Sequence, residues 1–180
     1  IQKFVGELNY PIYHLDFETF ASAVPVFDGS RPYQQMVFQY SLHIEHKAGQ
    51  LDHREYLAEV NGEDPRIKFI EQMIYDCGDS GDVLVYNIGF ERGKLFDLIE
   101  FSPKQKVPIL KIIDRLKDLM VPFRDRMYYT PSMQGSYSIK KVLPELVPEL
   151  SYKMLNIQEG GTASNTFSQM VQGNFEGDAE

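Results

Sequence analysis

Alternating apolar and polar residues predict three strands in the first third of the chain. The segment from Ile12 to Phe17 is rich in strand-forming residues, and from Met36 to Ile44 apolar side chains alternate with polar ones, as in a strand with one buried face. A third segment of this kind, from Leu51 to Leu57, follows a short polar break. We expect these three segments to form an antiparallel meander.

After these strands, apolar residues recur at helical spacing. Asp64 and Pro65 are residue types that start helices, and an apolar stripe then continues to Gly78. The stripe consists of Ile67, Ile70, Met73, Ile74 and Cys77. The pattern therefore predicts a helix that begins near Pro65 and ends at Gly78.

A short, continuously apolar segment, "DVLVY" from Asp82 to Tyr86, is typical of a strand buried on both faces. Helices are predicted from Phe90 to Glu100, around Pro108 to Met120, and near Ser138 to Leu143, followed by a polar tail. The order strand, strand, strand, helix, strand, helix indicates an α/β domain with a mixed sheet. In such a sheet the crossover helix makes the fourth strand parallel to the first and adjacent to it.

The length of 180 residues suits one domain with a hydrophobic core, so we expect a single domain over residues 1–180. Because Ile1 is not a start methionine and the tail "GNFEGDAE" has no stop signal, we expect a fragment of a longer protein. The sequence has no run of eighteen apolar residues and no signal peptide, which leaves membrane insertion and secretion unsupported and the cytoplasm as the expected location. Cys77, as a single cysteine, is expected to be a buried structural thiol.

The net charge of −8 argues against a protein that coats nucleic acid by bulk electrostatics. The basic residues are unevenly distributed, however: the segment from Pro103 to Lys141 contains nine Lys or Arg and three acidic residues. Two interpretations of this local excess of positive charge stay open: solvated charges on a helix and loops, or a surface that binds phosphates.

Two carboxylates mark the end of the first predicted strand. Asp16 and Glu18 are two residues apart, so a pleated backbone directs both to the same face. Such a pair is tolerated at a solvated edge, but at the end of a central strand it is costly unless a cation lies between the two groups. A hard divalent ion such as Mg²⁺ or Mn²⁺, which prefers oxygen ligands, would remove that cost.

Glu91 shares the apolar stripe of its predicted helix with Leu95, Leu98 and Ile99. Attraction to the positive end of the helix, worth about 0.3 to 1 kcal/mol, is the simpler explanation of a first-turn glutamate, but it suits a solvent-facing position better. The helix leaves the carboxyl end of the predicted strand from Asp82 to Tyr86, where open α/β sheets bind ligands. We therefore expect Glu91 to converge with Asp16 and Glu18.

These segments resemble a known group of enzymes. "HLDFETF" and "VLVYNIGFERGKL" are similar to the first and second motifs of the metal-dependent 3′–5′ exonucleases of the ribonuclease H-like superfamily, the proofreading or DEDD type. "KIIDRLKDLM" and "GSYSIKKVLPEL" resemble segments further along such domains. A closer resemblance is to an uncharacterised bacterial family that carries such a domain with F-E in the second motif. The resemblance implies a ribonuclease H-like, mixed five-stranded sheet flanked by helices.

Carried over by position, the resemblance assigns Asp16, Glu18 and Glu91 as catalytic and metal-binding acids. Asn87 matches the asparagine that steadies the second motif, and the resemblance also makes it a candidate substrate-binding residue. Glu91 replaces the more common Asp, so its carboxylate reaches one methylene further and the metal spacing differs.

The final motif, an Asp preceded by a Tyr or His general base, has no match in this chain. Asp178 lies in a tail of glycine and acid and is rejected as a substitute. Asp114 matches a position that is usually structural, and Asp118 is expected on a solvated face.

The resemblance implies two-metal hydrolysis of phosphodiester bonds at a nucleic-acid 3′ end, single-stranded DNA or RNA, with two Mg²⁺ or Mn²⁺ ions. Candidate contacts to the phosphates of the substrate are Ser136, Lys140, Lys141, Arg124 and Arg126. Three aromatic residues, Phe17, Phe20 and Tyr137, could stack on bases, but we expect them to be packing residues. The alternative is an inactive module that binds nucleic acid or docks another domain of the full-length chain. An unrelated α/β domain with coincidental acids would bind no divalent ion.

His14 shares the strand face of Asp16, but lies deeper in the strand and is expected to be a hydrogen-bonded core or near-core histidine. His43, His46 and His53 are expected to face water. No histidine spacing of a zinc hydrolase and no glycine-rich nucleotide-binding loop occurs in the sequence.

Overall fold

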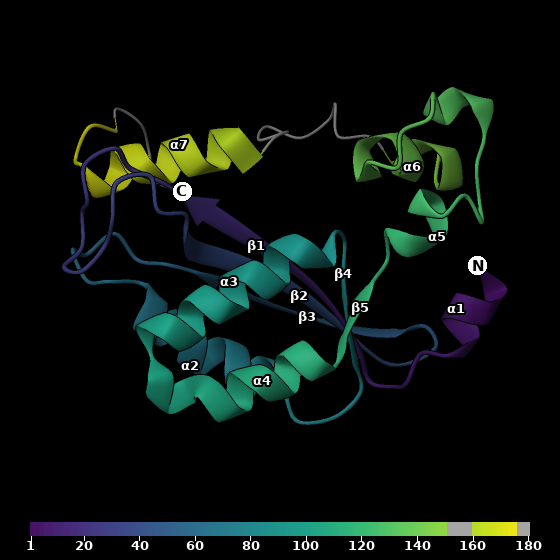
Figure 1. Cartoon of the computed structure of the whole chain (residues 1–180), viewed down its shortest axis with the longest axis horizontal. Helices are drawn as coiled ribbons and strands as arrows, with labels where there is room; N and C mark the ends of the chain where they lie inside the picture. Colours follow the sequence, from purple (N-terminus) through teal and green to yellow (C-terminus); the bar gives the residue numbers. More distant parts are fainter. Residues whose placement is uncertain (151–159, 176–180) are drawn as a thin grey trace.

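The structure, a computed structural model, describes residues 1–150 and 160–175. A mixed five-stranded sheet with the order β3-β2-β1-β4-β5 forms its centre (Figure 1). The strands are β1 (Ile12–Phe20), β2 (Met36–Lys47), β3 (Gln50–Leu57), β4 (Asp82–Val85) and β5 (Leu116–Asp118). β1 is antiparallel to β2 and parallel to β4, and β2 is antiparallel to β3, which confirms the predicted meander and crossover.

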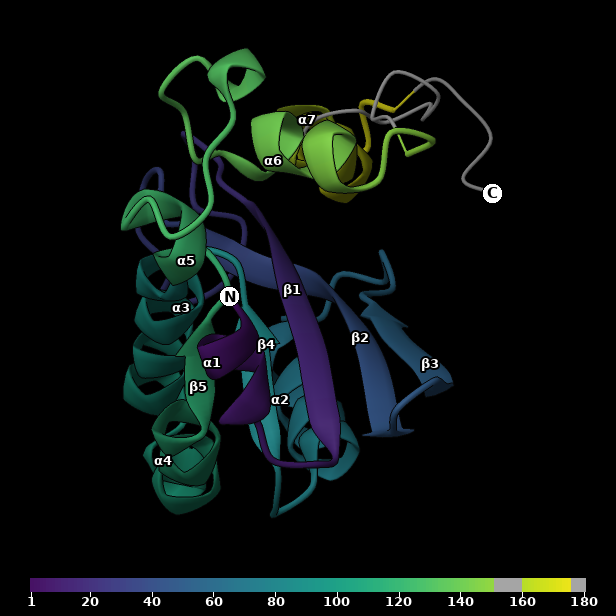
Figure 2. The ribbon, with the colours of Figure 1, turned by 90° about the vertical axis from the view of Figure 1, so that its right-hand side faces the viewer.

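Helices flank this sheet, as expected for an α/β fold. They are α1 (Gln2–Gly6), α2 (Arg66–Cys77), α3 (Ile88–Phe101), α4 (Lys106–Asp114), α5 (Val121–Arg124), α6 (Ile139–Leu146) and α7 (Gly160–Val171), with short 3₁₀ turns at Pro103–Gln105 and Pro131–Met133. Figure 2 shows α2, α3 and α4 together beside one face of the sheet and α6 and α7 near one end of it. The opposite face of β1, β2 and β3 is here called the open face. Within the described ranges, no helix is both long and apolar enough to cross a membrane.

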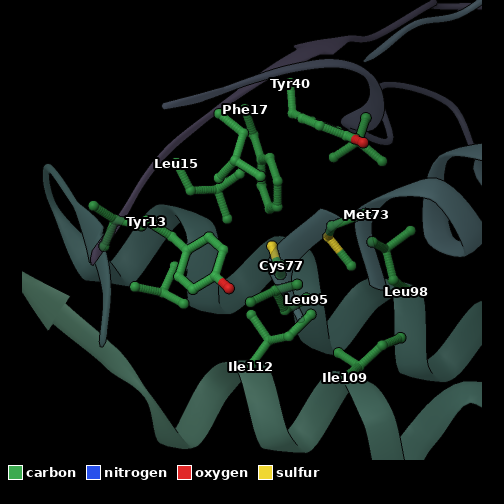
Figure 3. Packing of buried hydrophobic residues seen from close by; sticks show 14 of the residues in the cluster. Tyr13, Leu15, Phe17, Tyr40, Met73, Cys77, Leu95, Leu98, Ile109 and Ile112 are labelled. Carbon is green, nitrogen blue, oxygen red and sulfur yellow. The ribbon is translucent and has the colours of Figure 1, made fainter. Parts of the chain in front are cut away.

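The main core lies between the sheet and the helices α2, α3 and α4 (Figure 3). Tyr13, Leu15 and Phe17 of β1 point into it, because alternate residues of a strand share a face. Cys77 of α2 is fully buried there, as predicted. Phe20, also buried, packs in a second cluster at the carboxyl end of β1, so both phenylalanines of β1 are packing residues.

Ile67 is an exception to the predicted stripe of α2, because it is 51% exposed. The buried face of α2 is instead formed by Arg66, Phe69, Ile70, Met73, Asp76 and Cys77. Ile67 lies about 100° around the helix from Arg66, at the margin of that face. The start of the helix is otherwise close to the prediction, since the Asp64 Oδ1 accepts a hydrogen bond from the Arg66 backbone N–H at 3.0 Å.

The prediction of one helix around Pro108 to Met120 is wrong in its second half. α4 ends at Asp114, and Leu116–Asp118 forms β5, which pairs in parallel with β4. A three-residue strand is too short to show an alternating pattern, and its pairing with β4 overrides the helical spacing of the segment.

Helix α7 differs from the prediction, which assigns this segment to a polar tail. Its first residues include two glycines, and its sequence "GGTASNTFSQMV" has low helix propensity. Tertiary packing stabilises it: the Phe167 ring lies 4.1 Å from the Phe38 ring and 5.0 Å from the Phe20 ring, measured between centroids. α7 therefore closes the second cluster at the carboxyl end of β1.

Candidate functional site

Asp16 and Glu18 project together from the open face of β1, while Leu15 before them and Phe17 between them point into the core. Burial raises the pKa of Asp16, and a hydrogen bond with the Phe17 backbone partly opposes this increase. Burial also raises the pKa of Glu18, and the neighbouring charge of Asp16 raises it further. Asp16 is nevertheless exposed and Glu18 half-buried, so both carboxylates keep contact with solvent, and a cation beside them would favour their ionised forms.

Glu91 lies in the first turn of α3 with only 2% of its surface exposed, so it occupies the buried stripe as predicted. Its Oε2 is buried without a hydrogen-bond partner among the described residues. Burial raises the pKa of Glu91 to about 8, and the charges of Asp16 and Asp118 contribute to the increase. Glu91 is therefore within electrostatic reach of Asp16, and it does not stand in solvent at the end of the helix.

Asp118 is buried, which corrects the expectation of a solvated face. Its Oδ1 accepts hydrogen bonds from the backbone N–H groups of Asn87, at 3.1 Å, and Met120, at 2.9 Å. Its Oδ2 lies 3.7 Å from Nη1 of Arg124. The position follows from β5, whose pairing with β4 carries Asp118 to the carboxyl end of β4 beside the start of α3. Asp118 is thus the fourth carboxylate of this region, after Asp16, Glu18 and Glu91, and the helical spacing of its segment did not indicate this position.

Asn87 forms the turn between β4 and α3. Its backbone is left-handed, with φ 77° and ψ 71°, a conformation that Asn and Gly tolerate better than other residues. The side chain makes no capping hydrogen bond, whereas the backbone N–H donates to Asp118. The structure thus shows how the Asn87 backbone fixes the start of the helix that carries Glu91.

Asp16 opens onto a cavity of about 330 Å³ between the open face of the sheet and the start of α6. The cavity is lined by His14, Leu15, Asp16, Ser41, His43, Leu84, Val85, Tyr86, Leu119 and Ile139. The Tyr86 hydroxyl donates a hydrogen bond to the Tyr137 carbonyl at 2.6 Å, which holds the segment before α6 against the end of β4. Glu91 does not line this cavity.

Two of the predicted substrate contacts lie close in the chain to the cavity-lining Ile139: Ser136 is three residues before it and Lys140 directly follows it. Ser136 is half-buried, and its Oγ accepts a hydrogen bond from the Ser138 N–H at 3.2 Å, whereas Lys140 is exposed. Tyr137 is 44% exposed, so the expected packing role is wrong for this residue. Tyr137 lies in the loop before α6, where no strand or helix that the structure describes packs over its side chain as one would over a residue in the core of the sheet.

Other predicted phosphate contacts lie on the same stretch of chain. Arg124 forms ion pairs with Asp118 and Asp125, and Lys141 Nζ donates to the Gln134 Oε1 at 3.4 Å. Arg126 is exposed. The basic excess of this region is therefore divided between ion pairs that hold the loop and charges that face solvent.

His14 lies in the cavity wall and is half-buried, which agrees with the expected near-core position and not with a core position. Its side chain is 40% exposed, and its Nε2 lies 3.8 Å from Oε2 of Glu45. Burial lowers the pKa of His14, and the Glu45 charge opposes this effect. The open face lacks the helical cover that a core position would need. His43, His46 and His53 are exposed as predicted.

The site brings together Asp16 with Glu18, and Glu91 with Asp118, at the carboxyl end of the sheet. In the part of the chain that the structure describes, no three His, Cys, Asp or Glu side chains are grouped closely enough to hold a metal ion. Asp178 lies outside the described residues. The sequence interpretation placed Asp118 on a solvated face and did not select the cavity residues Ser41, Tyr86 and Leu119. Only the observed strand pairing brings Asp118 close to Glu91 and the other three to the cavity beside Asp16.

Comparison with known proteins identifies similar chains of uncharacterised activity. A family model described as "Domain of unknown function (DUF2779)" matches residues 13–138, more than half of the chain. The chain is 30% identical over 169 residues to the uncharacterized protein UU173 of Ureaplasma parvum serovar 3, a match that covers 82% of this chain and 24% of that protein. It is 31% identical over 171 residues to the uncharacterized protein MG366 homolog of Mycoplasma pneumoniae, covering 83% of this chain and 25% of the relative.

The chain therefore spans about a quarter of the length of these curated relatives. The comparison with solved structures finds no match.

Proposed function

The chain belongs to the DUF2779 family, and we propose that its domain hydrolyses phosphodiester bonds at the 3′ ends of nucleic acids with the help of divalent metal ions. The observation that carries this proposal is the environment of Glu91. A carboxyl group is buried with one oxygen unpartnered, close enough to Asp16 for its pKa to respond to that charge. Buried polar groups without a partner are rare, and a functional role is one common reason for them.

The donor set fits a hard divalent ion. Asp16 and Glu18 share one face of β1, burial raises the pKa of both, and their oxygens are the ligands that Mg²⁺ and Mn²⁺ prefer. These two residues would hold an ion directly, and the longer side chain of Glu91 would reach it directly or through water. A bound ion would activate water for attack on the phosphorus and stabilise the leaving oxygen.

The residues of the chain itself provide the rest of the proposed site. The cavity beside Asp16 has an apolar side formed by Leu84, Leu119 and Ile139, which suits the flat surface of a nucleobase. Lys140, which follows Ile139 in the chain, and Ser136, three residues before Ile139, would contact phosphate oxygens. The Tyr86 hydrogen bond to Tyr137 would keep this loop in place over the end of the strands.

A second candidate function is an inactive module that binds nucleic acid or docks another domain of the longer protein. The absence of three grouped ligands among the described residues favours it, because a site with two grouped acids holds a metal ion less firmly. The two functions predict different results in one experiment.

The test is an assay of 3′-end shortening of a single-stranded oligonucleotide labelled at its 5′ end, using protein of the relatives' full length with Mn²⁺. We expect shortening that requires Mn²⁺ and falls on the order of a hundredfold in Asp16→Asn and Glu91→Gln, with the exposed Asp114→Asn as the matched control that keeps its rate. Binding of the oligonucleotide without shortening by the wild type would support the inactive module. Equal rates in the wild type and Asp16→Asn would contradict the proposed site.

A further inference from the structure

Three histidines form a row across the open face of the sheet. His14 of β1 is paired with His43 of β2, and His43 is paired with His53 of β3. Directly opposite residues in antiparallel strands point to the same face, with Cβ atoms about 4.5–5.5 Å apart. The imidazole rings of this histidine row are therefore neighbours, and the row runs from the wall of the Asp16 cavity towards the β3 edge.

His43 and His53 form the most exposed part of the row. Their ring centroids are 4.4 Å apart, and the ring planes are inclined by 27°. Both residues are exposed, so their ring nitrogens are accessible from solvent. The His53 Nε2 lies 3.3 Å from the Ser41 hydroxyl, a contact that a small ring rotation would release. Two imidazoles on adjacent strands can then direct one nitrogen each to a shared ion at the usual distance of about 2.0–2.1 Å.

The charges around the row favour a cation over a phosphate. Asp16 and Glu18 of β1 lie on the same face, and Glu45 Oε2 lies 3.8 Å from the His14 Nε2. Glu55 of β3 is paired with Ser41, which is paired with Asp16, so it also faces this side of the sheet. Four carboxylates thus share the open face with the imidazoles, and their charges disfavour an anionic ligand and favour a positive one.

We propose that His43 and His53 form a binding site for a divalent transition-metal ion such as Zn²⁺ or Ni²⁺, with water in the remaining coordination positions. Neutral imidazole nitrogen suits Zn²⁺, Ni²⁺ and Cu²⁺, whereas Mg²⁺ and Mn²⁺ prefer the carboxylate oxygens at Asp16. The proposed site uses only two protein ligands, so it does not require a group of three His, Cys, Asp or Glu, and the described part of the chain has no such group. It also stands independently of the proposed hydrolysis.

The test is a calorimetric titration of the 180-residue chain with Ni²⁺ at neutral pH. We expect His43→Ala and His53→Ala to bind Ni²⁺ at least about tenfold more weakly than the wild type. His46→Ala is the matched control, because His46 is exposed on the same strand but contacts Asp52 at 2.8 Å. His46→Ala should keep the wild-type affinity, and excess Mg²⁺ should not displace Ni²⁺.

A second measurement does not depend on the folding of the variants. Paramagnetic Ni²⁺ should broaden the ring NMR signals of His43 and His53 in the wild type before those of His46. The proposal would be overturned if the wild type does not bind Ni²⁺ or if His43→Ala and His53→Ala keep the wild-type affinity. It would also be overturned if His46→Ala loses as much affinity as these two variants. Failure of the Asp16 site to bind Mn²⁺ would leave these results unaffected, so the two proposals can fail separately.

Discussion

Glu91 combines an ionisable group with a position that excludes almost all solvent. Its Oε2 has no partner among the described residues, and burial raises its pKa to about 8. At neutral pH and without a cation, Glu91 therefore retains its proton. A metal ion beside Asp16 would favour the ionised form, so ion binding and release of this proton are coupled in the proposed site.

The pKa of Glu91 predicts how stability depends on pH. Because its pKa is higher in the folded chain than the ordinary value of 4.5, the folded state binds the proton more tightly, and the free energy of unfolding falls as the pH rises from about 4.5 to about 8. The slope approaches about 1.4 kcal/mol per pH unit in that range. Denaturant unfolding at a series of pH values, with a chelator present, measures it.

Glu91→Gln is the diagnostic variant for this pH dependence. It should remove most of the slope, because glutamine has no proton to lose, and it should make the chain more stable than the wild type above pH 8. The Asp114→Asn control should keep the wild-type slope. Parallel curves for the wild type and Glu91→Gln would show that Glu91 ionises normally.

Asn87 offers a prediction that separates a backbone role from contact with a substrate. Since its φ is 77°, Asn87→Ala should destabilise the fold by about 1 kcal/mol, whereas Asn87→Gly should remain within a few tenths of the wild-type value. Thermal unfolding of both variants tests this. If Asn87→Gly is as unstable as Asn87→Ala, the side chain has a structural role that the left-handed backbone does not explain.

Single residues on periodic segments could be predicted, and loop or short-strand residues could not. The 3.6-residue period placed Glu91 and Cys77 in the interior, and both are buried. The prediction is wrong for Asp118 and only partly right for His14, because the environment of each residue depends on which faces of the sheet other segments cover. That information comes from pairing and packing between distant parts of the chain.

At the scale of elements, Arg115 connects the junction of α4 and β5 to the end of α2. Its guanidinium donates hydrogen bonds to the carbonyls of Cys77, Gly78 and Ser80, at 3.0, 2.8 and 2.5 Å. Carbonyls at the end of a helix have no partner within the helix, so Arg115 satisfies those that follow α2. The contact ties the residue between α4 and β5 to the end of α2.

Removal of this contact should lower stability. Arg115→Ala should cost about 2–3 kcal/mol, because hydrogen bonds from a charged donor are stronger than neutral ones, and Arg115→Lys should recover part of the loss. The exposed Arg126→Ala is a suitable control, with an expected change below about 0.5 kcal/mol. Urea unfolding of the three variants measures the effect, and equal stabilities for Arg115→Ala and Arg126→Ala would contradict this role.

Element type could be predicted where a segment is long enough to show a period. β2, α2 and α3 were recognised in this way, with ends that differ by a few residues. β5 has three residues and α7 begins with glycines, so neither carries a usable signal. Pairing with β4 stabilises the first and packing of Phe167 stabilises the second.

At the scale of the whole molecule, α7 joins the end of the described chain to its first strand. Phe167 packs on Phe20 of β1 and Phe38 of β2, so a segment some 150 positions away in the sequence completes the second cluster. This cluster lies at the same end of β1 as Glu18. The position of α7 therefore supports the strand end from which the proposed site is built.

The contribution of α7 can be measured by truncation of its buried ring. Phe167→Ala should destabilise the chain by about 3–5 kcal/mol, because it removes a buried aromatic side chain and leaves a cavity. Phe96→Ala, which removes a half-exposed ring from α3, should cost clearly less. Chemical unfolding gives both values, and a loss for Phe167→Ala no greater than for Phe96→Ala would show that α7 does not hold the second cluster together.

The architecture of the molecule followed from the order of its elements, since three strands, a helix and a fourth strand leave few arrangements for a mixed sheet. The site followed only in part. Asp16, Glu18 and Glu91 were predicted together from strand and helix periods, and the structure places Glu91 within the electrostatic influence of Asp16. The cavity and Asp118 depend on β5 and on the segment before α6, which no local pattern specified.

The most direct test of the central claim is a calorimetric titration of the 180-residue chain with Mn²⁺. The claim is that Asp16, Glu18 and Glu91 form one site for a divalent ion. It predicts that the wild type and Asp114→Asn bind Mn²⁺ with equal affinity, and that Asp16→Asn, Glu18→Gln and Glu91→Gln each bind at least about tenfold more weakly. Unchanged affinity in Asp16→Asn, or no Mn²⁺ binding by the wild type, would contradict it.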